Sequence, residues 1–397
     1  MTTRTAALAL LAALTAQPAA ADPRLLGDAA GMRTRLERLG IGVQLFYSQY
    51  VSGNPSGGAE PRSSGHSGGY DFFTRVDAQE LLEWRGLVGL LHVKGQYDRN
   101  INADVGGLSH PIDDADFDEP AYIDELWLEQ SFAGDRAQLR AGFLEQQTVF
   151  DRNAYANNED RQFLSTFLDN NPVVPLPNGL GAVLLLRPAQ RIELALGAAD
   201  ADNVPRSAGF DTAFDGLDSL TGYLEAALRV DLPGASGPLP GRYRVGVFLD
   251  GREKRVFGSD RRERGHLGVY ASLDQLLVHE ASDPRQGLGL FARGGWADGD
   301  VNRIEWFWSA GLQYTGLLPG RGHDVVGLGA YQAIGSDRLR DREDPDFDRE
   351  TGIELYYRIA VFPWLALTPD VQYVIDPGAR GKHRDAVVTT MRFRVTF

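Results

Sequence analysis

From Gly40 to the last residue, polar and apolar side chains alternate with a period of two, and no other feature constrains the fold as strongly. A period of two places successive side chains on opposite faces of an extended strand. Segments with this alternation begin near residues 41, 70, 87, 122, 136, 180, 191, 219, 241, 264, 287, 304, 323, 350, 364 and 386. Their number is even, as in single-chain outer-membrane barrels. The sequence therefore predicts an all-β fold, a transmembrane antiparallel β-barrel of about 16 strands.

The connections between these segments tend to alternate between long and tight. Long connections are expected at Gly53–Gly69, Arg99–Ala121, Thr148–Gly179, Asp200–Asp218, Gly335–Arg349 and Asp376–Asp385. Tight connections are expected near Trp84–Gly86, Gly134–Asp135, Pro188–Gln190 and Phe362–Trp364. The alternation is weaker at 231–240, 278–286 and 299–303. Long extracellular loops and short periplasmic turns are typical of a barrel in the bacterial outer membrane, whereas a soluble β-sandwich has no reason to separate its loops in this way.

The first 21 residues have the features of a secretory signal peptide. Arg4 supplies a positive charge, Ala6–Leu14 is apolar, and Ala19–Ala21 offers a cleavage site of small residues. The apolar run is too short for a membrane helix, which needs about 20 residues. The sequence therefore predicts export.

The chain after the signal divides into two parts. Residues 22–40 are expected to be a helical segment, with a helix over Gly27–Gly40 that Asp28 caps and Gly40 ends. Residues 41–397 are assigned to the transmembrane barrel.

Composition excludes several classes of site. The chain has no Cys, which rules out disulfides, thiolate zinc sites and Cys nucleophiles. Its net charge of -14 argues against nucleic acid as a partner, since that requires a clustered basic face. No sequence motif calls for a cofactor. The mean hydropathy of -0.27 resembles that of a soluble protein, but a spanning barrel also gives such a value because only alternate residues face lipid.

The longest connection, Thr148–Gly179, carries a proline-rich stretch and aromatic residues that include Tyr155, Phe163 and Phe167. A loop of this length needs a reason. A barrel of about 16 strands would otherwise leave a broad aqueous channel. We therefore expect this third long loop to fold inward and form the constriction.

The polar strand faces indicate what could line the pore. Strand pairing is expected to bring together four charged residues inside the barrel: Arg75, Asp77, Lys94 and Asp98. A second group lies on the next two strands and consists of Glu125, Trp127, Glu129 and Arg140. Carboxylates accept hydrogen bonds from hydroxyls, arginine and lysine donate them, and an aromatic ring packs against the C–H face of a sugar. These residues therefore suit a neutral, hydroxyl-rich solute, although mutual neutralisation in a wet lumen explains them equally well.

Two acidic clusters lie in long connections, DDADFDE at Asp113–Glu119 and RDREDPDFDRE at Arg340–Glu350. Neither matches an EF-hand loop, so solvated loops are the simpler interpretation. The metal candidates in the first cluster are weak: Asp113, Asp114, Asp116 and Asp118. Through divalent ions, such loops could also bridge lipopolysaccharide.

An enzymatic alternative rests on His266, which shares a polar face with Ser272 and Asp274. These residues could form a hydrolase triad, but the sequence has no GxSxG, HExxH or P-loop motif. A polar residue lining the lumen is the simpler interpretation of His266, so we expect no enzyme.

Four stretches make the chain resemble the carbohydrate-selective porins of the OprB family. They are GDAAGMRTRLERLGI at Gly27–Ile41, ELWLEQSF with LRAGFLE between Glu125 and Glu145, PNGLGAVLLLRPAQRIEL at Pro177–Leu194, and ELYYRIAVFPWLALTPDVQYVIDPG at Glu354–Gly378. In the first, Ala29 and Ala30 replace the usual Trp-Gly. The resemblance implies a 16-stranded outer-membrane barrel, passive diffusion of monosaccharides such as glucose, and a constriction of charged and aromatic residues.

The alternative function is a general or anion-preferring pore for small solutes. The sequence is compatible with either a monomer or a homotrimer. The terminal Phe397 closes an alternating strand, as expected of a signal for the barrel-assembly machinery.

Overall fold

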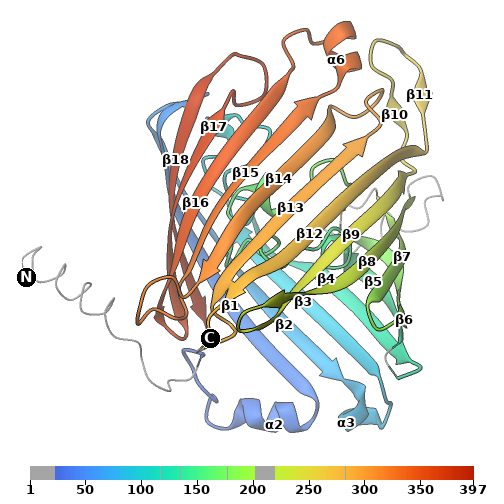
Figure 1. Ribbon diagram of the computed structural model, residues 1–397, viewed down its shortest axis with the longest axis vertical. Coiled ribbons are helices and arrows are strands. Elements are labelled where there is room, and N and C mark those ends of the chain that lie inside the picture. Colours follow the sequence, from blue (N-terminus) through green and yellow to red (C-terminus); the bar gives the residue numbers. More distant parts are fainter. Residues whose placement is uncertain (1–22, 117, 135, 177, 202–219, 282) are drawn as a thin grey trace, which may run out of the picture.

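The computed structural model describes residues 23–116, 118–134, 136–176, 178–201, 220–281 and 283–397. Sixteen antiparallel strands form a closed barrel, which confirms the predicted fold. The first strand, β1 (Ile41–Gly58), pairs with the last, β18 (Arg384–Thr396), so every barrel strand has two neighbours (Figure 1). The predicted signal peptide, residues 1–21, and most of the expected Asp200–Asp218 connection lie outside the described residues.

The other barrel strands follow in chain order: β2 (Ser63–Asp77), β3 (Leu87–Tyr97), β4 (Glu119–Phe132), β5 (Ala137–Glu145), β6 (Asn178–Ala189), β7 (Ile192–Asp200), β8 (Leu220–Gly234), β9 (Gly237–Asp250), β12 (His266–His279), β13 (Gly287–Ala297), β14 (Ile304–Thr315), β15 (Val325–Gly335), β16 (Arg349–Phe362) and β17 (Leu365–Ile375). A two-stranded ribbon in one connection consists of β10 (Lys254–Arg255) and β11 (Arg262–Glu263). The helices are short: α2 (Met32–Arg38), α3 (Ala78–Leu82), α4 (Asn102–Val105), α5 (Thr166–Asp169), α6 (Asp337–Arg342) and the 3-10 turn η1 (Gln146–Thr148). Among the described residues, no helix is both long enough and apolar enough to cross a membrane.

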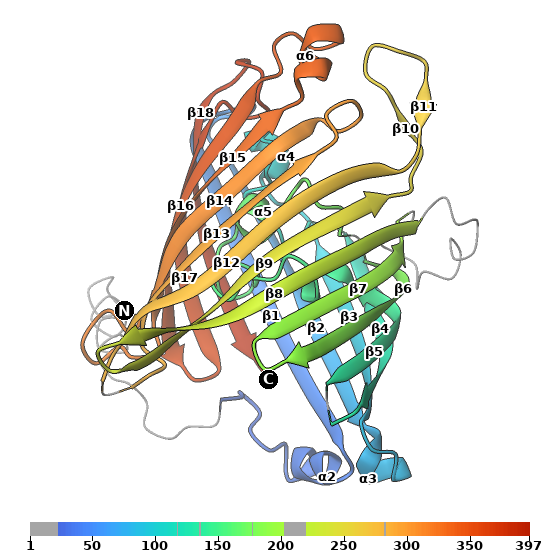
Figure 2. The same ribbon diagram turned by 45° about the vertical axis from the view of Figure 1, so that its right-hand side comes forward.

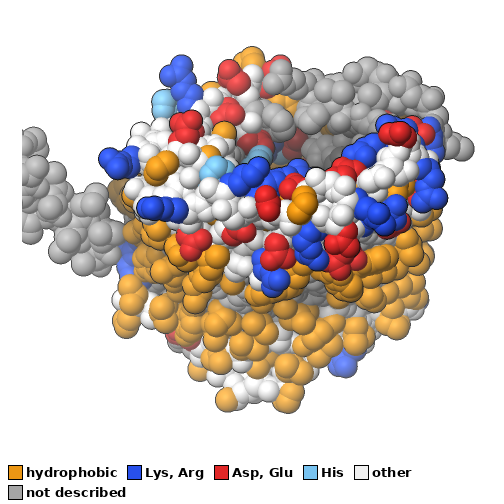
Figure 3. All heavy atoms as spheres, turned by 90° about the horizontal axis from the view of Figure 1, so that it is seen from above, with side chains coloured by type: hydrophobic (Ala, Val, Ile, Leu, Met, Phe, Trp, Pro, Cys, Tyr) orange, Lys and Arg blue, Asp and Glu red, His pale blue; other side chains and the backbone are white. Residues whose placement is uncertain are grey.

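The outer wall of the barrel is apolar and the inner wall is polar. On β4, Leu126 and Leu128 are 41% and 59% exposed on the outside, whereas Glu125, the residue before Leu126, is buried inside. Figure 3 shows hydrophobic side chains covering the visible outer wall beneath a charged rim. A bilayer requires such an apolar band on the outside of a barrel.

Two strand pairs extend further than the sequence indicated. The expected loop Gly53–Gly69 is wrong for most of its length, because β1 runs to Gly58 and β2 begins at Ser63. Likewise, β8 and β9 continue to Gly234 and Gly237 and leave a tight turn between them. Glycine and serine indicate loops in sequence analysis, but a neighbouring strand satisfies their backbone groups equally well.

The predicted N-terminal helix is shorter than expected. It covers only Met32–Arg38, because Ala29 and Ala30 have φ of 47° and 58° and cannot continue a right-handed helix. Asp28 nevertheless stabilises the helix start, since its Oδ1 accepts from the Thr34 N–H at 2.9 Å. The predicted end is confirmed, as Gly40 has φ +75° just after the helix.

Several inward-facing tyrosines lie over a glycine of the neighbouring strand. Tyr356 is paired with Gly327 and Tyr270 with Gly246. A Cβ added to these glycines would lie 2.3 Å from the Tyr356 ring and 2.1 Å from the Tyr270 ring. The glycines therefore let the rings lie flat against the inner wall of the barrel.

The substitution Gly327→Ala should lower the free energy of unfolding by about 1–3 kcal/mol, because the ring of Tyr356 must move. Urea unfolding of the detergent-solubilised barrel measures this change. Gly222→Ala is the matched control, since a Cβ there meets nothing within 4 Å. Equal losses for the two variants would contradict the steric explanation.

Candidate functional site

The connection between β5 and β6, here called loop 3 (residues 146–176), folds into the barrel (Figure 2). Three of its phenylalanines pack on tyrosines of the inner wall. The ring centroids of Phe150 and Tyr223 are 4.8 Å apart, those of Phe163 and Tyr356 are 5.0 Å apart, and those of Phe167 and Tyr331 are 5.3 Å apart. Loop 3 therefore has an apolar core of its own within the polar lumen, and the predicted inward fold is confirmed.

Buried charges of the wall hold the backbone of loop 3. The carboxylate of Glu354 on β16 accepts from the N–H groups of Leu164 and Ser165 at 2.6 and 3.0 Å. The guanidinium of Arg293 on β13 donates to the carbonyl of Asp169 at 2.9 Å and pairs with the carboxylate of Asp151 at 2.9 Å. Burial raises the pKa of Asp151 to about 7, although Arg293 opposes the shift. The backbone of loop 3 therefore provides hydrogen-bond partners for the buried wall charges, and the same bonds fix the position of the loop.

A second connection, loop 2 (residues 98–118), also enters the barrel and packs on loop 3. Glu350 accepts from Leu108 N–H at 2.6 Å, and Asp113 N–H donates to the Leu164 carbonyl at 2.9 Å. The expectation of a solvated acidic cluster is therefore wrong for Asp114, which is buried, whereas Asp113 is half-buried and Asp118 is exposed. Burial raises the pKa of Asp113 to about 8.

A cavity of about 320 Å³, large enough for a small solute, lies between loop 3 and strands β2 to β5. We call it the polar cavity. Its strand side chains include Asp71, His92, Lys94, Asp124 and Glu125, and loop 3 adds Asn153, Asn157, Asn158, Glu159 and Asp160. Almost every lining group can donate or accept a hydrogen bond.

Two cations on β3, His92 and Lys94, are held by carboxylates in the polar cavity. His92 lies between two of them, with Nε2 2.9 Å from Asp71 Oδ1 and Nδ1 3.1 Å from Asp124 Oδ2. Its ring stacks on Phe73 with centroids 3.8 Å apart. The ammonium of Lys94 is 3.2 Å from Asp114 of loop 2. The wall of the cavity is therefore a rigid network of charges rather than a set of free side chains.

Asp124 reaches this network because of an irregularity in β4. The register shifts between the pairs His92↔Glu125 and Val93↔Ile123, which leaves Asp124 without a strand partner. Such a β-bulge lets two consecutive side chains point to the same face. Strict alternation along β4 would place Asp124 on the lipid side, so the sequence pattern alone does not identify it as a lumen residue.

Glu125, Trp127, Glu129 and Arg140 form a continuous chain of contacts, as their shared face predicted. The Trp127 Nε1–H donates to Glu125 Oε1 at 2.9 Å, and the Arg140 guanidinium lies 4.1 Å from the centre of the Trp127 ring. Arg140 also bonds Glu129 Oε2 through Nε and Nη2 at 3.0 and 2.9 Å. Glu125 belongs to the polar cavity as well, so this chain continues the cavity wall along β4 and β5.

The other predicted group is not brought together. Lys94 lies opposite Asp71, whereas Arg75 lies opposite Leu90 and Asp77 opposite Val88. Asp77 instead caps α3, accepting from the Gln79 N–H at 3.1 Å, and Asp98 lies in loop 2 beyond the other end of β3. The sequence identified the correct polar face of these strands. The expected proximity of the four charged residues was wrong, because residues on one face can lie at opposite ends of a strand.

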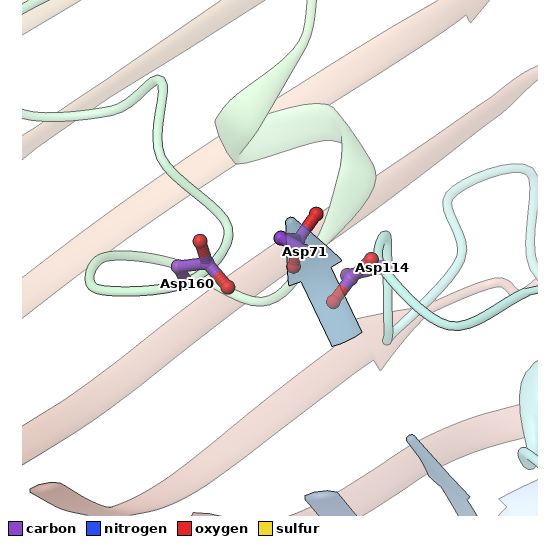
Figure 4. A group of neighbouring side chains, drawn as sticks. All are labelled: Asp71, Asp114 and Asp160. Atoms are coloured by element: carbon purple, nitrogen blue, oxygen red, sulfur yellow. The ribbon is translucent and has the colours of Figure 1, made fainter. Parts of the chain in front are cut away.

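The carboxylates of Asp71, Asp114 and Asp160 approach one another within 4.8 Å (Figure 4). Lys94 and Arg394 already pair with Asp114 and Asp160. Burial favours the neutral form of Asp114, but Lys94 outweighs it and holds the pKa of Asp114 below its ordinary value. The positive charge that balances these carboxylates is thus supplied by the side chains of Lys94 and Arg394. The predicted metal candidate Asp116 lies apart from it, and burial raises the pKa of Asp116 to about 6.

His266 and Ser272 do not form a catalytic pair. They are six positions apart on one strand, which is about 20 Å. The His266 Nε2 bonds the Glu263 carbonyl at 3.0 Å, and the Ser272 hydroxyl donates to the Arg152 carbonyl at 3.2 Å. The hydrolase alternative is therefore wrong.

Residues 62–397 match the carbohydrate-selective porin, OprB family. The chain belongs to this family. It is 22% identical over 417 residues to Porin B of Pseudomonas aeruginosa, which covers 94% of this chain and 91% of that protein. It is also 23% identical over 233 residues to a putative porin, QuiX, of Acinetobacter baylyi, which covers 53% of each. The high-pH structure of Pseudomonas putida OprB superposes with a TM-score of 0.85 at 20% identity, covering 95% of this chain and 99% of that one.

Family membership fixes the role and the place of the barrel. The protein is an outer-membrane sugar porin, a multi-pass β-barrel and not an enzyme. The ends of the strands that carry the long loops are therefore extracellular, and those joined by tight turns are periplasmic.

The substitution Arg293→Gln should release part of loop 3, because Asp151 and several loop carbonyls lose their buried cation. Removing one partner of a buried ion pair costs about 3–5 kcal/mol. We expect faster proteolysis within loop 3 and a larger single-channel conductance in planar bilayers. Arg285→Gln is the control, since Arg285 pairs with Asp283 on an exposed turn. Unchanged conductance and protection in Arg293→Gln would show that the aromatic contacts alone hold the loop.

Proposed function

We propose that the porin selects monosaccharides such as glucose and that the polar cavity, together with the Glu125–Trp127–Arg140 chain, is its selective region. The observation that carries this proposal is the contact between Arg140 and Trp127, which holds an indole ring at the lumen wall beside carboxylates. The indole nitrogen is already bonded to Glu125, so the ring has a fixed orientation. A ring fixed in this way offers an apolar surface to the C–H face of a sugar.

The size and chemistry of the polar cavity support the same solute. Its 320 Å³ is at the lower end of the range for small-molecule pockets, roughly 300–1,000 Å³. Carboxylates accept from sugar hydroxyls, and the amides of Asn153, Asn157 and Asn158 donate or accept. Because His92 and Lys94 are paired with carboxylates of the wall, a neutral polar solute can exchange hydrogen bonds there without leaving either cation unpaired.

Passage requires that binding be weak and repeated. A pore conducts when its solute binds well enough to enter and weakly enough to leave. Loop 3 narrows the barrel at the cavity, while the remaining charged residues extend along the strands toward the periplasm. Sugars would therefore move between successive polar contacts, driven only by their concentration gradient.

We also propose the remaining partners from the same architecture. Residues 1–21 direct export as a cleaved signal peptide, and Phe397 marks the last strand for the barrel-assembly machinery. Exposed acidic residues around α6, such as Asp337 and Asp341, would meet lipopolysaccharide through divalent cations. Outer-membrane lipid contacts the apolar wall.

The substitution Trp127→Ala should weaken glucose binding in the pore by about threefold to tenfold, the range expected from loss of an aromatic contact. Block of single-channel current by added glucose measures this binding, and liposome swelling measures flux. Trp308→Ala is the matched control, because Trp308 is on the outer wall and 42% exposed.

The proposal fails if vesicles that contain the wild-type porin take up glucose no faster than empty vesicles. The proposed selective region is wrong if the same glucose concentration blocks the single-channel currents of the Trp127→Ala and Trp308→Ala variants.

A further inference from the structure

A second cavity, of about 310 Å³, lies in the periplasmic half of the lumen against strands β6 to β9. We call it the basic cavity. Its charged lining consists of Arg152, Arg187, Arg242, Arg244, Glu193 and Glu225. Four guanidinium groups therefore face two carboxylates in a chain whose net charge is -14. This part of the wall therefore carries a local excess of positive charge.

One carboxylate serves three arginines at this site. Glu193 lies 3.4 Å from Arg242, 3.9 Å from Arg229 and 4.0 Å from Arg187. Arg229 and Arg242 are directly opposite each other in the pairing of β8 and β9. Like charges placed opposite each other in a sheet are destabilising, and Glu193 neutralises only one charge of the three. The group therefore has room for a further anion.

Arg152 supplies another donor from loop 3. It lines both the basic cavity and the polar cavity, and its side chain is exposed to the lumen. In the part of the chain that the structure describes, its guanidinium has no ion-pair partner. Partial desolvation inside the barrel and the nearby Arg244 and Arg242 lower the pKa of Arg152, so a solute anion would relieve repulsion there. By contrast, Arg244 is already paired with Asp274 at 2.7 Å.

The opposite side of the lumen shows the same excess. A cavity of 460 Å³ near the last strand is lined by Arg24, Arg161, Arg358 and Arg394, with Glu37 as its acidic residue. It also contains Pro363, Trp364 and Phe397, which places it at the periplasmic end. The periplasmic half of the pore is thus positive on both sides of loop 3, and such a field concentrates anions.

We propose that the basic cavity binds the anionic group of a sugar derivative, so that the porin conducts hydroxylated solutes bearing a carboxylate or a phosphate besides neutral sugars. Arginine is suited to this role because its fork of N–H donors matches both groups. The inference rests on the proposed function for the hydroxylated part of the solute, which the polar cavity would contact. The anionic part would be held by Arg152, Arg187 and Arg242.

Uptake of three solutes into proteoliposomes tests the proposal: glucose, gluconate and glucose 6-phosphate. The double variant R187Q/R242Q should reduce gluconate uptake about tenfold, because two charges near the anion are lost. Glucose uptake should change less than about twofold, since neither residue lines the polar cavity. The variant E193Q should act in the opposite direction and raise gluconate uptake about threefold. Added salt should reduce the difference between gluconate and glucose.

The controls separate charge from folding. R285Q removes an arginine from an exposed turn and should leave all three rates unchanged. Heat-dependent gel mobility establishes that each variant barrel is folded. Opposite effects of R187Q/R242Q and E193Q cannot arise from a general loss of structure.

The proposal is overturned if gluconate and glucose 6-phosphate both enter porin-containing vesicles no faster than empty vesicles. It is also overturned if R187Q/R242Q and E193Q leave the uptake of both anions unchanged. Arginine-dependent uptake of glucose 6-phosphate alone supports it and identifies phosphate as the preferred group. If gluconate uptake depends on the arginines but glucose does not enter, the basic cavity stands and the proposed function fails.

Discussion

Backbone hydrogen bonding in an apolar solvent is the constraint on which this structure depends. A bilayer offers no partner for an exposed N–H or carbonyl group, so a sheet can span it only when it closes. The pairing of β1 with β18 meets this requirement, and the last strand pairs with β17 on its other side. Closure creates a polar interior, and everything that distinguishes this pore from an open tube is built within that interior.

The interior is filled by loops that the wall charges hold. Buried charges are costly unless they are paired or hydrogen-bonded. Glu350 and Glu354 on β16 and Arg293 on β13 meet this condition by bonding backbone groups of loops 2 and 3. The loops in turn gain fixed positions from these bonds and from aromatic packing on the inner wall. Wall and loops therefore stabilise each other, and the polar cavity is formed where they meet.

Charge is distributed unevenly along the pore. The polar cavity combines carboxylates with Lys94 and His92, whereas arginines predominate toward the periplasm. In the function proposed above, a neutral sugar would exchange hydrogen bonds mainly with the polar cavity. An anionic sugar derivative would interact most strongly with the second. The same barrel can therefore treat two kinds of solute differently through the position of a few guanidinium groups.

The sequence by itself determined the barrel, its sixteen strands, the inward third loop and the Glu125–Trp127–Glu129–Arg140 face, because alternation and connection length are local properties. Only the tertiary structure decided which charges meet. Register placed Asp71 rather than Arg75 or Asp77 beside Lys94, and a bulge turned Asp124 inward. Packing of loop 2 against loop 3 buried Asp114 and half-buried Asp113. Register, bulges and loop packing arise from contacts between segments distant in the chain, so no local pattern records them.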